Sequence, residues 1–273
     1  MRNANTLVVG LGEVGSALSQ VLRRTGRVLE HDIERCEFDE PIGVMHLCIP
    51  FTRQADFEAT AVSYIQRFKP ELTIINSTVV PGTSRNIATQ ALVPIAYSPV
   101  RGKHIRMAED LIRYRKFVAA SDDHTAERAA EHFRAAGMTT QCTSKLETLE
   151  LAKLGETTYF GVLIAFAQEL NRYANRVDGD YAEALDFFEE VEFLPNTKYF
   201  PGFIGGHCVI PNIDLMRKIA ASPMLEAVLE SNRRRVEELG NEARMALSPD
   251  PKFSAVTAKS KSVGDAPLNF ARR

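Results

Sequence analysis

The sequence lacks the features that would commit it to a membrane or to a disulfide framework. No segment reaches the roughly 18 uninterrupted apolar residues of a membrane span, and Glu13 interrupts the apolar N-terminal run before a signal-peptide core can form. The four cysteines, Cys36, Cys48, Cys142 and Cys208, stand at wide and unpatterned spacing, which is typical of reduced thiols. These absences predict a cytoplasmic protein that does not associate with membranes.

The sequence also has little excess charge of either sign. Its 33 Lys and Arg residues and 35 Asp and Glu residues give a net charge of -2. The one basic run, at 233–235, is followed by Glu237 and Glu238, which indicates a solvated helix face. Because nucleic-acid phosphates must be met by clustered positive charge, we expect no nucleic-acid partner.

Short apolar runs alternate with amphipathic segments through the first half of the chain. Such alternation is typical of βαβ units and predicts a Rossmann-type parallel sheet, and therefore an α/β fold. Asp122 or Asp123 is a suitable N-cap for the helix that follows the run at 116–120. Strands are expected at residues 7–9, 27–32, 44–49, 72–75, 94–97, 116–120 and 138–142.

From residue 144 the pattern changes to that of helices. A long helix is expected over residues 144–177, with Ser144 as N-cap and Glu147 as its capping-box partner. Its stretch 159–167 is apolar nearly all round, so we expect burial under other helices or against a second subunit. A loop rich in proline and glycine is predicted over 195–211.

The change of pattern at residue 144 also predicts the domain organisation of the chain. Another helix follows Asp180 from Tyr181, and more helix is expected at 214–239. The last residues are poor in large apolar groups and read as a flexible tail. We therefore predict a Rossmann-type domain over 1–143, an all-helical domain over 144–240, and a tail over 241–273.

Gly10, Gly12 and Gly15 form a G-x-G-x-x-G motif directly after the first strand and at the opening of a helix. Gly10 permits the tight turn, Gly12 lets the backbone approach a pyrophosphate, and Gly15 allows close packing of helix and strand. Asp32 ends the next strand at the expected distance of about 20 residues, where a carboxylate accepts hydrogen bonds from both ribose hydroxyls and repels a ribose phosphate. The motif predicts NAD rather than NADP, which makes residues 1–143 the NAD-binding domain and leaves residues 144–240 as the dimerisation and substrate domain. The residues expected to contact it are Gly10, Leu11, Gly12, Glu13, Val14, Gly15, Asp32, Pro50, Ser77 and Thr78.

Three further segments, taken in their order along the chain, indicate a function. They are Asn76-Ser-Thr-Val-Val-Pro-Gly-Thr83, Glu150-Leu-Ala-Lys153 and Gly205-Gly-His-Cys208. With them, residues 5–215 resemble the UDP-glucose/GDP-mannose dehydrogenase family, which has an S-T-x-x-P-G-T turn, a lysine on the central helix and a G-G-x-C loop. Nothing after residue 215 resembles that family's third, nucleotide-binding domain, so the resemblance is to a short, divergent member.

The resemblance implies catalytic roles for three residues. Cys208 would be the nucleophile that attacks an aldehyde to form a thiohemiacetal, Lys153 would stabilise the oxyanion, and Thr78 would orient a water. The chemistry of the residue types agrees, because a partly exposed thiolate is a strong nucleophile and an ammonium stabilises developing negative charge. His207 and Cys208 are adjacent, which is a poor chelating geometry, so we expect no metal.

The resemblance also implies a substrate site. Residues 98–104 occupy the place of the family's S-P-E-R stretch, where cationic side chains suit an anionic small molecule; a solvated basic loop is the open alternative. The residues expected to contact substrate are Arg101, Lys103, His104, Thr157, Gly205, Gly206, His207 and Asn212.

The chain departs from the family pattern at three polar positions. Val100 replaces the acidic residue after Ser-Pro, Thr157 replaces the helix asparagine, and Asn212 replaces the aspartate after the cysteine; Asp214 is the nearest substitute. Acid–base groups contribute about 10²- to 10⁴-fold to a rate. Losing them is therefore expected to slow or abolish the second, hydrolytic half of a four-electron oxidation.

We expect an NAD-dependent dehydrogenase that oxidises an alcohol of a sugar, sugar nucleotide or nucleoside phosphate and forms a homodimer through its central helices. Three alternatives stay open. They are a two-electron dehydrogenase of the β-hydroxyacid type, an NAD-dependent redox-neutral epimerase, and a non-catalytic NAD-binding regulatory protein.

Overall fold

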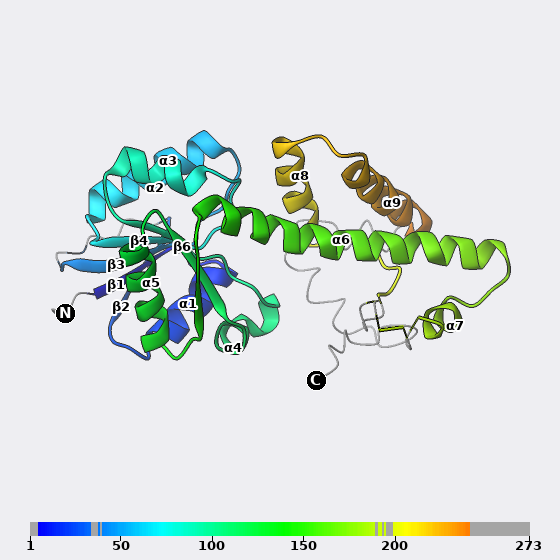
Figure 1. The fold of residues 1–273 in the computed structure, drawn as a ribbon, viewed down its shortest axis with the longest axis horizontal. Helices are drawn as coiled ribbons and strands as arrows, with labels where there is room; N and C mark the ends of the chain where they lie inside the picture. The colour runs from blue at the N-terminus through cyan, green and yellow to red at the C-terminus, as the bar shows by residue number, and fades with distance from the viewer. Residues whose placement is uncertain are drawn as a thin grey trace. The chain divides into compact units, whose positions relative to one another are not determined.

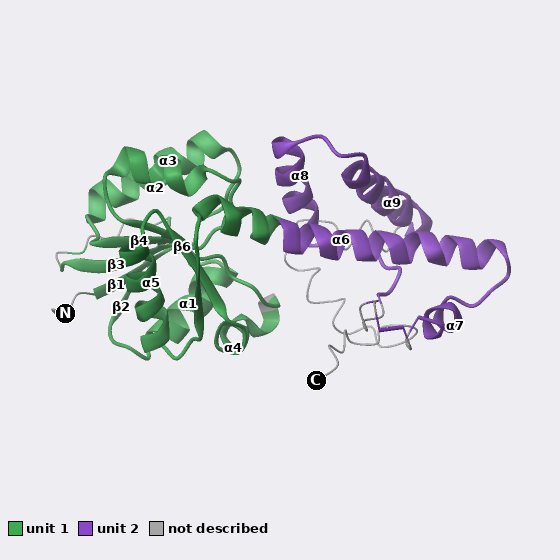
Figure 2. Ribbon diagram, viewed as in Figure 1, with its two compact units in different colours: residues 1–154 green, residues 155–273 purple. Residues whose placement is uncertain are grey.

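The computed structural model describes residues 5–33, 38, 40–188, 191–192, 194 and 199–240, with His104 described by its backbone alone. Cys36 and the predicted tail at 241–273 lie outside the described residues. The chain forms two compact units, residues 1–154 and 155–273 (Figure 2). The division falls within the long helix, because its first turns pack on the sheet of the first unit, so the predicted boundary at residue 143 stays an interpretation.

The first unit contains a seven-stranded sheet in the order β2-β1-β3-β4-β5-β6-β7 (Figure 1). Each of the strands expected from the sequence is present, and β1 to β5 run parallel. The fold is therefore the predicted α/β arrangement. The strands are β1 (Asn5–Val9), β2 (Val28–His31), β3 (Ile42–Leu47), β4 (Leu72–Ile75), β5 (Ile95–Tyr97), β6 (Lys116–Ala120) and β7 (Thr140–Thr143).

Helices cover both faces of this sheet. Apolar side chains of α1, α4 and α5 form the core on one face, and those of α2, α3 and the start of α6 form the core on the other. Asp122 caps α5, as expected, by accepting a 2.8 Å hydrogen bond from the Thr125 backbone N–H. The helices are α1 (Glu13–Leu22), α2 (Gln54–Phe68), α3 (Thr83–Ala91), α4 (Met107–Arg113) and α5 (Asp123–Ala135), with a 3₁₀ turn at His104–Arg106.

The sheet is not wholly parallel, and this corrects the sequence-based expectation. β6 runs antiparallel to β5, with Ala96 opposite Ala120 and Tyr97 opposite Ala119. The cause is the connection between them. After β5 the chain forms α4, which packs beside α1, and it enters β6 at Lys116, whose ammonium binds the Ser98 backbone at the end of β5. Since β6 starts at the edge where β5 ends, the two strands run in opposite directions.

The second unit is helical. The long helix α6 (Leu146–Arg176) continues into it from the first unit, and α8 (Val209–Ile219) and α9 (Pro223–Leu239) pack on α6 through a small core of their own. At Gly161 of α6 an added Cβ would lie 2.8 Å from a Val209 methyl and 3.1 Å from Ile213 Cδ1, so the glycine permits a close approach of α6 and α8. The short helix α7 (Tyr181–Asp186) follows the predicted break, capped by Asp180.

Two details of these helices differ from expectation. Entry into α6 is at Lys145, whose carbonyl accepts from the Leu149 N–H, and Glu147 is bound by Arg85 on α3 rather than acting in a capping box. The loop predicted to reach residue 211 ends earlier, since α8 begins at Val209. Proline is compatible with a first helical turn because its missing N–H has no intrahelical partner there, and so Pro211 fits inside α8.

The apolar stretch of α6 is buried on one side only. Ala165 and Ala167 are buried, whereas Tyr159 is 55% and Phe166 58% exposed. Burial under neighbouring helices therefore accounts for one face of this stretch and leaves the other open. No helix among the described residues is long and apolar enough to cross a bilayer.

Candidate active site

The glycine-rich turn between β1 and α1 has the backbone geometry that its sequence predicts. Gly10 has φ +89°, and a Cβ there would lie 2.6 Å from the Cys48 carbonyl oxygen. A Cβ on Gly15 would lie 1.8 Å from the Gly10 carbonyl oxygen, so only glycine fits. Gly12 is different, because a Cβ there would meet nothing within 4 Å. The turn thus presents open space in front of the α1 N-terminus, where backbone N–H groups point outward.

Asp32 lies beside this turn. The Gly10 N–H donates to the His31 carbonyl at 2.8 Å and so aligns the ends of β1 and β2. The Asp32 carboxylate is exposed and accepts a long, 3.4 Å hydrogen bond from the Leu11 N–H. An exposed carboxylate at this position has acceptor capacity left for two hydroxyl groups.

Further predicted site residues follow β3 and β4, at the same edge of the sheet. The Ser77 hydroxyl donates to the Ile49 carbonyl at 2.6 Å, which ties the end of β4 to the segment that follows β3 and contains Pro50. Thr78 is half-buried and directly follows Ser77. Because carboxyl ends of parallel strands meet at one edge, the structure brings the glycine turn, Asp32, Pro50, Ser77 and Thr78 together there.

Lys153 belongs to the part of α6 that packs on the first unit. One turn before it, the fully buried Glu150 carboxylate accepts from the backbone N–H groups of Gly82, at 2.7 Å, and Ser84, at 2.9 Å. Burial raises the pKa of Glu150, and these two N–H groups oppose the rise. Glu150 thereby fastens the beginning of α6 to the N-terminus of α3, next to the turn that contains Thr78. Glu150 stands in the predicted motif at 150–153, but nothing in the sequence indicates this role.

Several groups of the predicted substrate stretch at 98–104 form contacts within the protein. The Arg101 guanidinium donates to the Arg115 carbonyl at 2.6 Å and lies over the Phe117 ring at 4.9 Å. The Lys103 backbone N–H donates to the buried Asp110 carboxylate at 2.9 Å, and the Lys103 side chain is half-buried. Arg101 is therefore anchored, and it contributes positive charge from a fixed position.

Lys116 is a buried cation at the same edge that sequence reasoning missed. Its ammonium donates to the carbonyls of Ser98, at 2.8 Å, and Pro99, at 2.9 Å. Burial lowers the pKa of Lys116 to about 7, and the positive charges of Lys153 and Arg101 act in the same direction. A lysine before an apolar strand is normally solvated, so the sequence carried no signal for this contact.

A buried histidine pair lies beside Lys116. His46 Nδ1 is 2.9 Å from the Asn76 side-chain oxygen, and His46 Nε2 is 3.0 Å from His132 Nε2. Burial lowers the pKa of both rings, that of His132 to about 4, so both are neutral near pH 7. The Asn76 amide donates to the Ser98 carbonyl at 2.6 Å, and its oxygen requires a proton on His46 Nδ1. The sequence signal for this pair is His46, a histidine within an apolar run that forms a strand.

In the second unit, Cys208 is half-buried and occupies the N-cap position of α8. The preceding Gly206 has φ +75°, a left-handed conformation that favours glycine. Gly205 and His207 complete the loop, and His207 is exposed. Among the described residues, no group of three or more His, Cys, Asp or Glu side chains is placed to hold a metal.

Thr157 and Asn212, two of the positions that depart from the family pattern, lie in contact with each other. The Asn212 amide donates to the Thr157 hydroxyl oxygen at 2.8 Å, from α8 to α6. Asn212 is buried and uncharged. The pair is thus a neutral hydrogen bond between two of the predicted substrate residues, and no carboxylate takes part in it.

Comparison with known proteins finds sequences and structures similar to this chain. Residues 147–234 match the model of the "UDP-glucose/GDP-mannose dehydrogenase family, central domain". A UDP-N-acetyl-D-mannosamine dehydrogenase from Methanocaldococcus jannaschii is 28% identical over 159 residues, which are 53% of this chain and 36% of the relative. The chain therefore spans well under half the length of this curated relative.

Solved structures give the same fold. A UDP-D-ManNAc dehydrogenase from Pyrococcus horikoshii superposes with a TM-score of 0.74 at 19% identity, covering 86% of this chain and 69% of that one. A Mycobacterium tuberculosis 3-hydroxyisobutyrate dehydrogenase has a TM-score of 0.68 at 15% identity, covering 95% of this chain and 99% of that one. At these identities the likeness establishes the fold, and the sequence matches carry the relationship. Residues 147–234 are thus similar to the central domain of the UDP-glucose/GDP-mannose dehydrogenase family.

Proposed function

We propose that this chain is an NAD-dependent dehydrogenase that oxidises an alcohol group of a sugar nucleotide or a related anionic sugar. The observation that carries the proposal is the glycine turn with Asp32 beside it. Open space in front of Gly12 fits a pyrophosphate, and the exposed Asp32 carboxylate fits the two hydroxyls of a ribose. When bound there, NAD supplies a hydride acceptor.

The proposed chemistry on the protein side uses three residues. Thr78 orients a water, and the Lys153 ammonium stabilises negative charge on the substrate oxygen as the alcohol becomes an aldehyde. The Cys208 thiolate then adds to the aldehyde carbon to give a thiohemiacetal. In a second oxidation, with a further NAD molecule as hydride acceptor, the thiohemiacetal carbon loses a hydride and its hydroxyl loses a proton to solvent, which gives a thioester. Water then breaks the carbon–sulfur bond to release a carboxylate and the thiolate.

Substrate recognition is proposed for two groups of residues. Arg101, Lys103 and His104 suit the anionic part of the substrate, since the anchored Arg101 guanidinium places a charge without further ordering cost. The second group comprises Gly205, Gly206 and His207, which precede Cys208, together with Thr157 and Asn212, which contact each other. The relatives' names make UDP-N-acetyl-D-mannosamine the first compound to test.

The number of NADH molecules formed per substrate consumed tests this mechanism. Wild type is expected to give two, and Cys208→Ala one or none, because the second oxidation requires the thiohemiacetal. Cys142→Ser is the matched control, since Cys142 is an exposed cysteine of the first unit. One NADH in both wild type and Cys208→Ala would exclude the cysteine mechanism.

A single two-electron oxidation is the second candidate, and two observations favour it. The Thr157–Asn212 pair contains no carboxylate to activate a hydrolytic water. The chain also matches a 3-hydroxyisobutyrate dehydrogenase along nearly the whole of both chains. This candidate predicts one NADH per substrate, independent of Cys208. An epimerase would form product without net NADH, and a regulatory protein would bind NAD without turnover.

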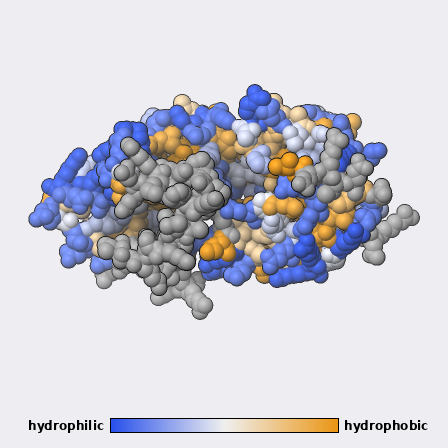
Figure 3. Space-filling model, turned by 180° about the vertical axis from the view of Figure 1, so that it is seen from behind, coloured by the Kyte–Doolittle hydropathy of each residue, from blue (hydrophilic) through white to orange (hydrophobic). Residues whose placement is uncertain are grey.

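We also propose that the chain works as a homodimer joined through α6. Tyr159, Phe166 and Tyr173 are spaced by seven residues, so they lie on one face of the helix, and each is more than half exposed. Hydrophobic surface appears in several separate places in Figure 3, but these residues form a regular stripe. Light scattering should give twice the monomer mass, and Phe166→Glu should give a folded monomer; a monomeric wild type at micromolar concentration would refute the proposal.

We further propose that the protein acts in the cytoplasm. Cys48, Cys142 and Cys208 are thiols rather than disulfides, as a reducing compartment requires.

A further inference from the structure

We propose that Asn232, assisted by Gln168, is a positioning residue for the loop that carries Cys208. The proposal rests on the proposed function, in which Cys208 is the nucleophile. Neither amide belongs to a motif that the sequence singled out, and all of the contacts that follow lie within the second unit.

The segment in front of the loop is held by side chains rather than by a strand or helix. The Ile204 N–H donates to the Asn232 side-chain oxygen at 2.6 Å, and the Asn232 amide donates back to the Ile204 carbonyl at 3.1 Å. Two residues earlier, the Gly202 carbonyl accepts from the Gln168 amide at 2.7 Å. Asn232 thus makes the pair of bonds that a neighbouring strand would make to Ile204.

The orientation of both amides is fixed by their partners. Because the Ile204 N–H can only donate, the Asn232 atom beside it must be oxygen. Gln168 donates to this oxygen at 3.3 Å and accepts at its own oxygen from the Ser231 hydroxyl at 2.9 Å. Asn232 is 8% exposed and Gln168 is fully buried, so water cannot replace these bonds.

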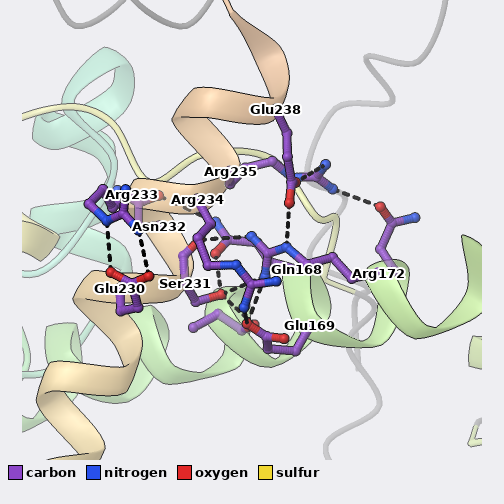
Figure 4. A network of polar contacts seen from close by, with 12 residues as sticks. Gln168, Glu169, Arg172, Glu230, Ser231, Asn232, Arg233, Arg234, Arg235 and Glu238 are labelled. Atoms are coloured by element: carbon purple, nitrogen blue, oxygen red, sulfur yellow. Dashed lines mark hydrogen bonds and ion pairs between the residues drawn. The ribbon is translucent and has the colours of Figure 1, made fainter. Parts of the chain in front are cut away.

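The amides are themselves braced by a buried arginine. Arg172 of α6 donates to the Ser231 carbonyl at 2.8 Å and to the Glu238 carboxylate at 2.6 Å, which joins α6 to α9 on either side of Asn232 (Figure 4). Asn171 belongs to the same helix interface, where it accepts from Arg235 at 2.8 Å. No described contact joins Asn171 to the segment 202–204.

These contacts reach Cys208 through a short stretch of chain. Ile204 is buried, and Gly205 and Gly206 follow it before His207 and Cys208. Glycines place no side-chain restriction on their backbone. Because only three residues separate Ile204 from Cys208, and α8 begins at Val209, the fixed point at Ile204 limits the positions that this link can give Cys208.

The experiment compares Asn232→Ala with Asn171→Ala, which removes the same side chain from the same helix interface. The readout is the alkylation rate of Cys208 by iodoacetamide, followed by peptide mass spectrometry in the folded protein. It is measured at pH 9, where a thiol of ordinary pKa near 8.5 is mostly ionised, so that access dominates. We expect at least fivefold faster alkylation in Asn232→Ala and a rate within twofold of wild type in Asn171→Ala. Asn232→Asp keeps the acceptor for the Ile204 N–H, and it should fall between them.

Turnover supplies the second readout. If Asn232 positions Cys208, Asn232→Ala lowers kcat at least tenfold and leaves the KM for NAD unchanged. Equal alkylation rates in Asn232→Ala and Asn171→Ala would overturn the proposal. A change in alkylation in a protein whose NADH yield does not depend on Cys208 would retain the positioning role and reject the cysteine mechanism.

Discussion

The two units hold their proposed functional residues in different ways. In the first unit the residues follow strand ends, and backbone hydrogen bonds such as that from Gly10 to His31 set their positions. In the second unit the loop before Cys208 depends on the side chains of Asn232 and Gln168, which Arg172 braces in turn. The comparison indicates that the glycine turn of the first unit tolerates most side-chain changes around it, whereas the loop of the second unit is sensitive to single truncations within its helix interface.

The largest effect should come from Arg172→Ala in the second unit. The truncation leaves the Ser231 carbonyl and the Glu238 and Glu169 carboxylates without this partner. We expect a loss of about 3 kcal/mol in the free energy of unfolding, the low end for a broken buried pair, because both carboxylates are about one third exposed. Arg85→Ala, which breaks a more exposed pair in the first unit, should cost under about 1 kcal/mol in urea unfolding. Equal losses would erase the distinction between the units.

An intermediate effect should come from Gly15→Ala, which challenges the backbone geometry of the first unit. The new Cβ meets the Gly10 carbonyl oxygen at 1.8 Å, so the turn must shift. The expected cost is about 1–3 kcal/mol of stability, as for overpacking, together with at least tenfold weaker NAD binding by calorimetry. Gly12→Ala is the matched control, because its Cβ meets nothing within 4 Å and should leave stability within about 1 kcal/mol. A well-folded Gly15→Ala protein with normal NAD affinity would contradict the assignment.

The last effect appears only as a change with pH and concerns Lys116, which, like Glu150, is a buried side chain that binds backbone groups of the first unit. Its pKa is lowered to about 7 in the folded chain, so between pH 7 and its ordinary value of 10.5 the unfolded chain binds more protons. The free energy of unfolding should therefore rise with pH across this window, by up to about 1.4 kcal/mol per pH unit. Lys116→Met should flatten that slope in urea titrations at successive pH values. A slope that persists in the variant would assign it to another group.

The features that could be predicted from the sequence are those that short stretches of chain determine. The strands, the glycine turn and the Asp122 cap each depend on residues within a few positions of one another. Lys116 and Asn232 were missed because their partners are distant in sequence: Ser98 lies 18 residues from Lys116, and Ile204 lies 28 residues from Asn232. A polar residue whose burial depends on such pairing looks like a solvated one until the fold is known.

The direction of β6 illustrates the same limit. The apolar run at 116–120 predicts a strand but carries no information on its direction, which the packing of α4 beside α1 determines. Pro211 is a second case, since a proline was interpreted as part of a loop although a first helical turn accommodates it.

The hydrogen bond between Thr157 and Asn212 has a consequence for how this chain can change. Replacing Asn212 alone by aspartate would keep the bond only with the hydroxyl as donor, and it would bury a charge beside α6. Replacing Thr157 alone by asparagine would place a larger side chain against an amide already fixed in orientation. The two positions are therefore coupled, and neither step towards the family's pair is neutral by itself. Two substitutions made together are the accessible route, and in a double-mutant cycle their effects should not add.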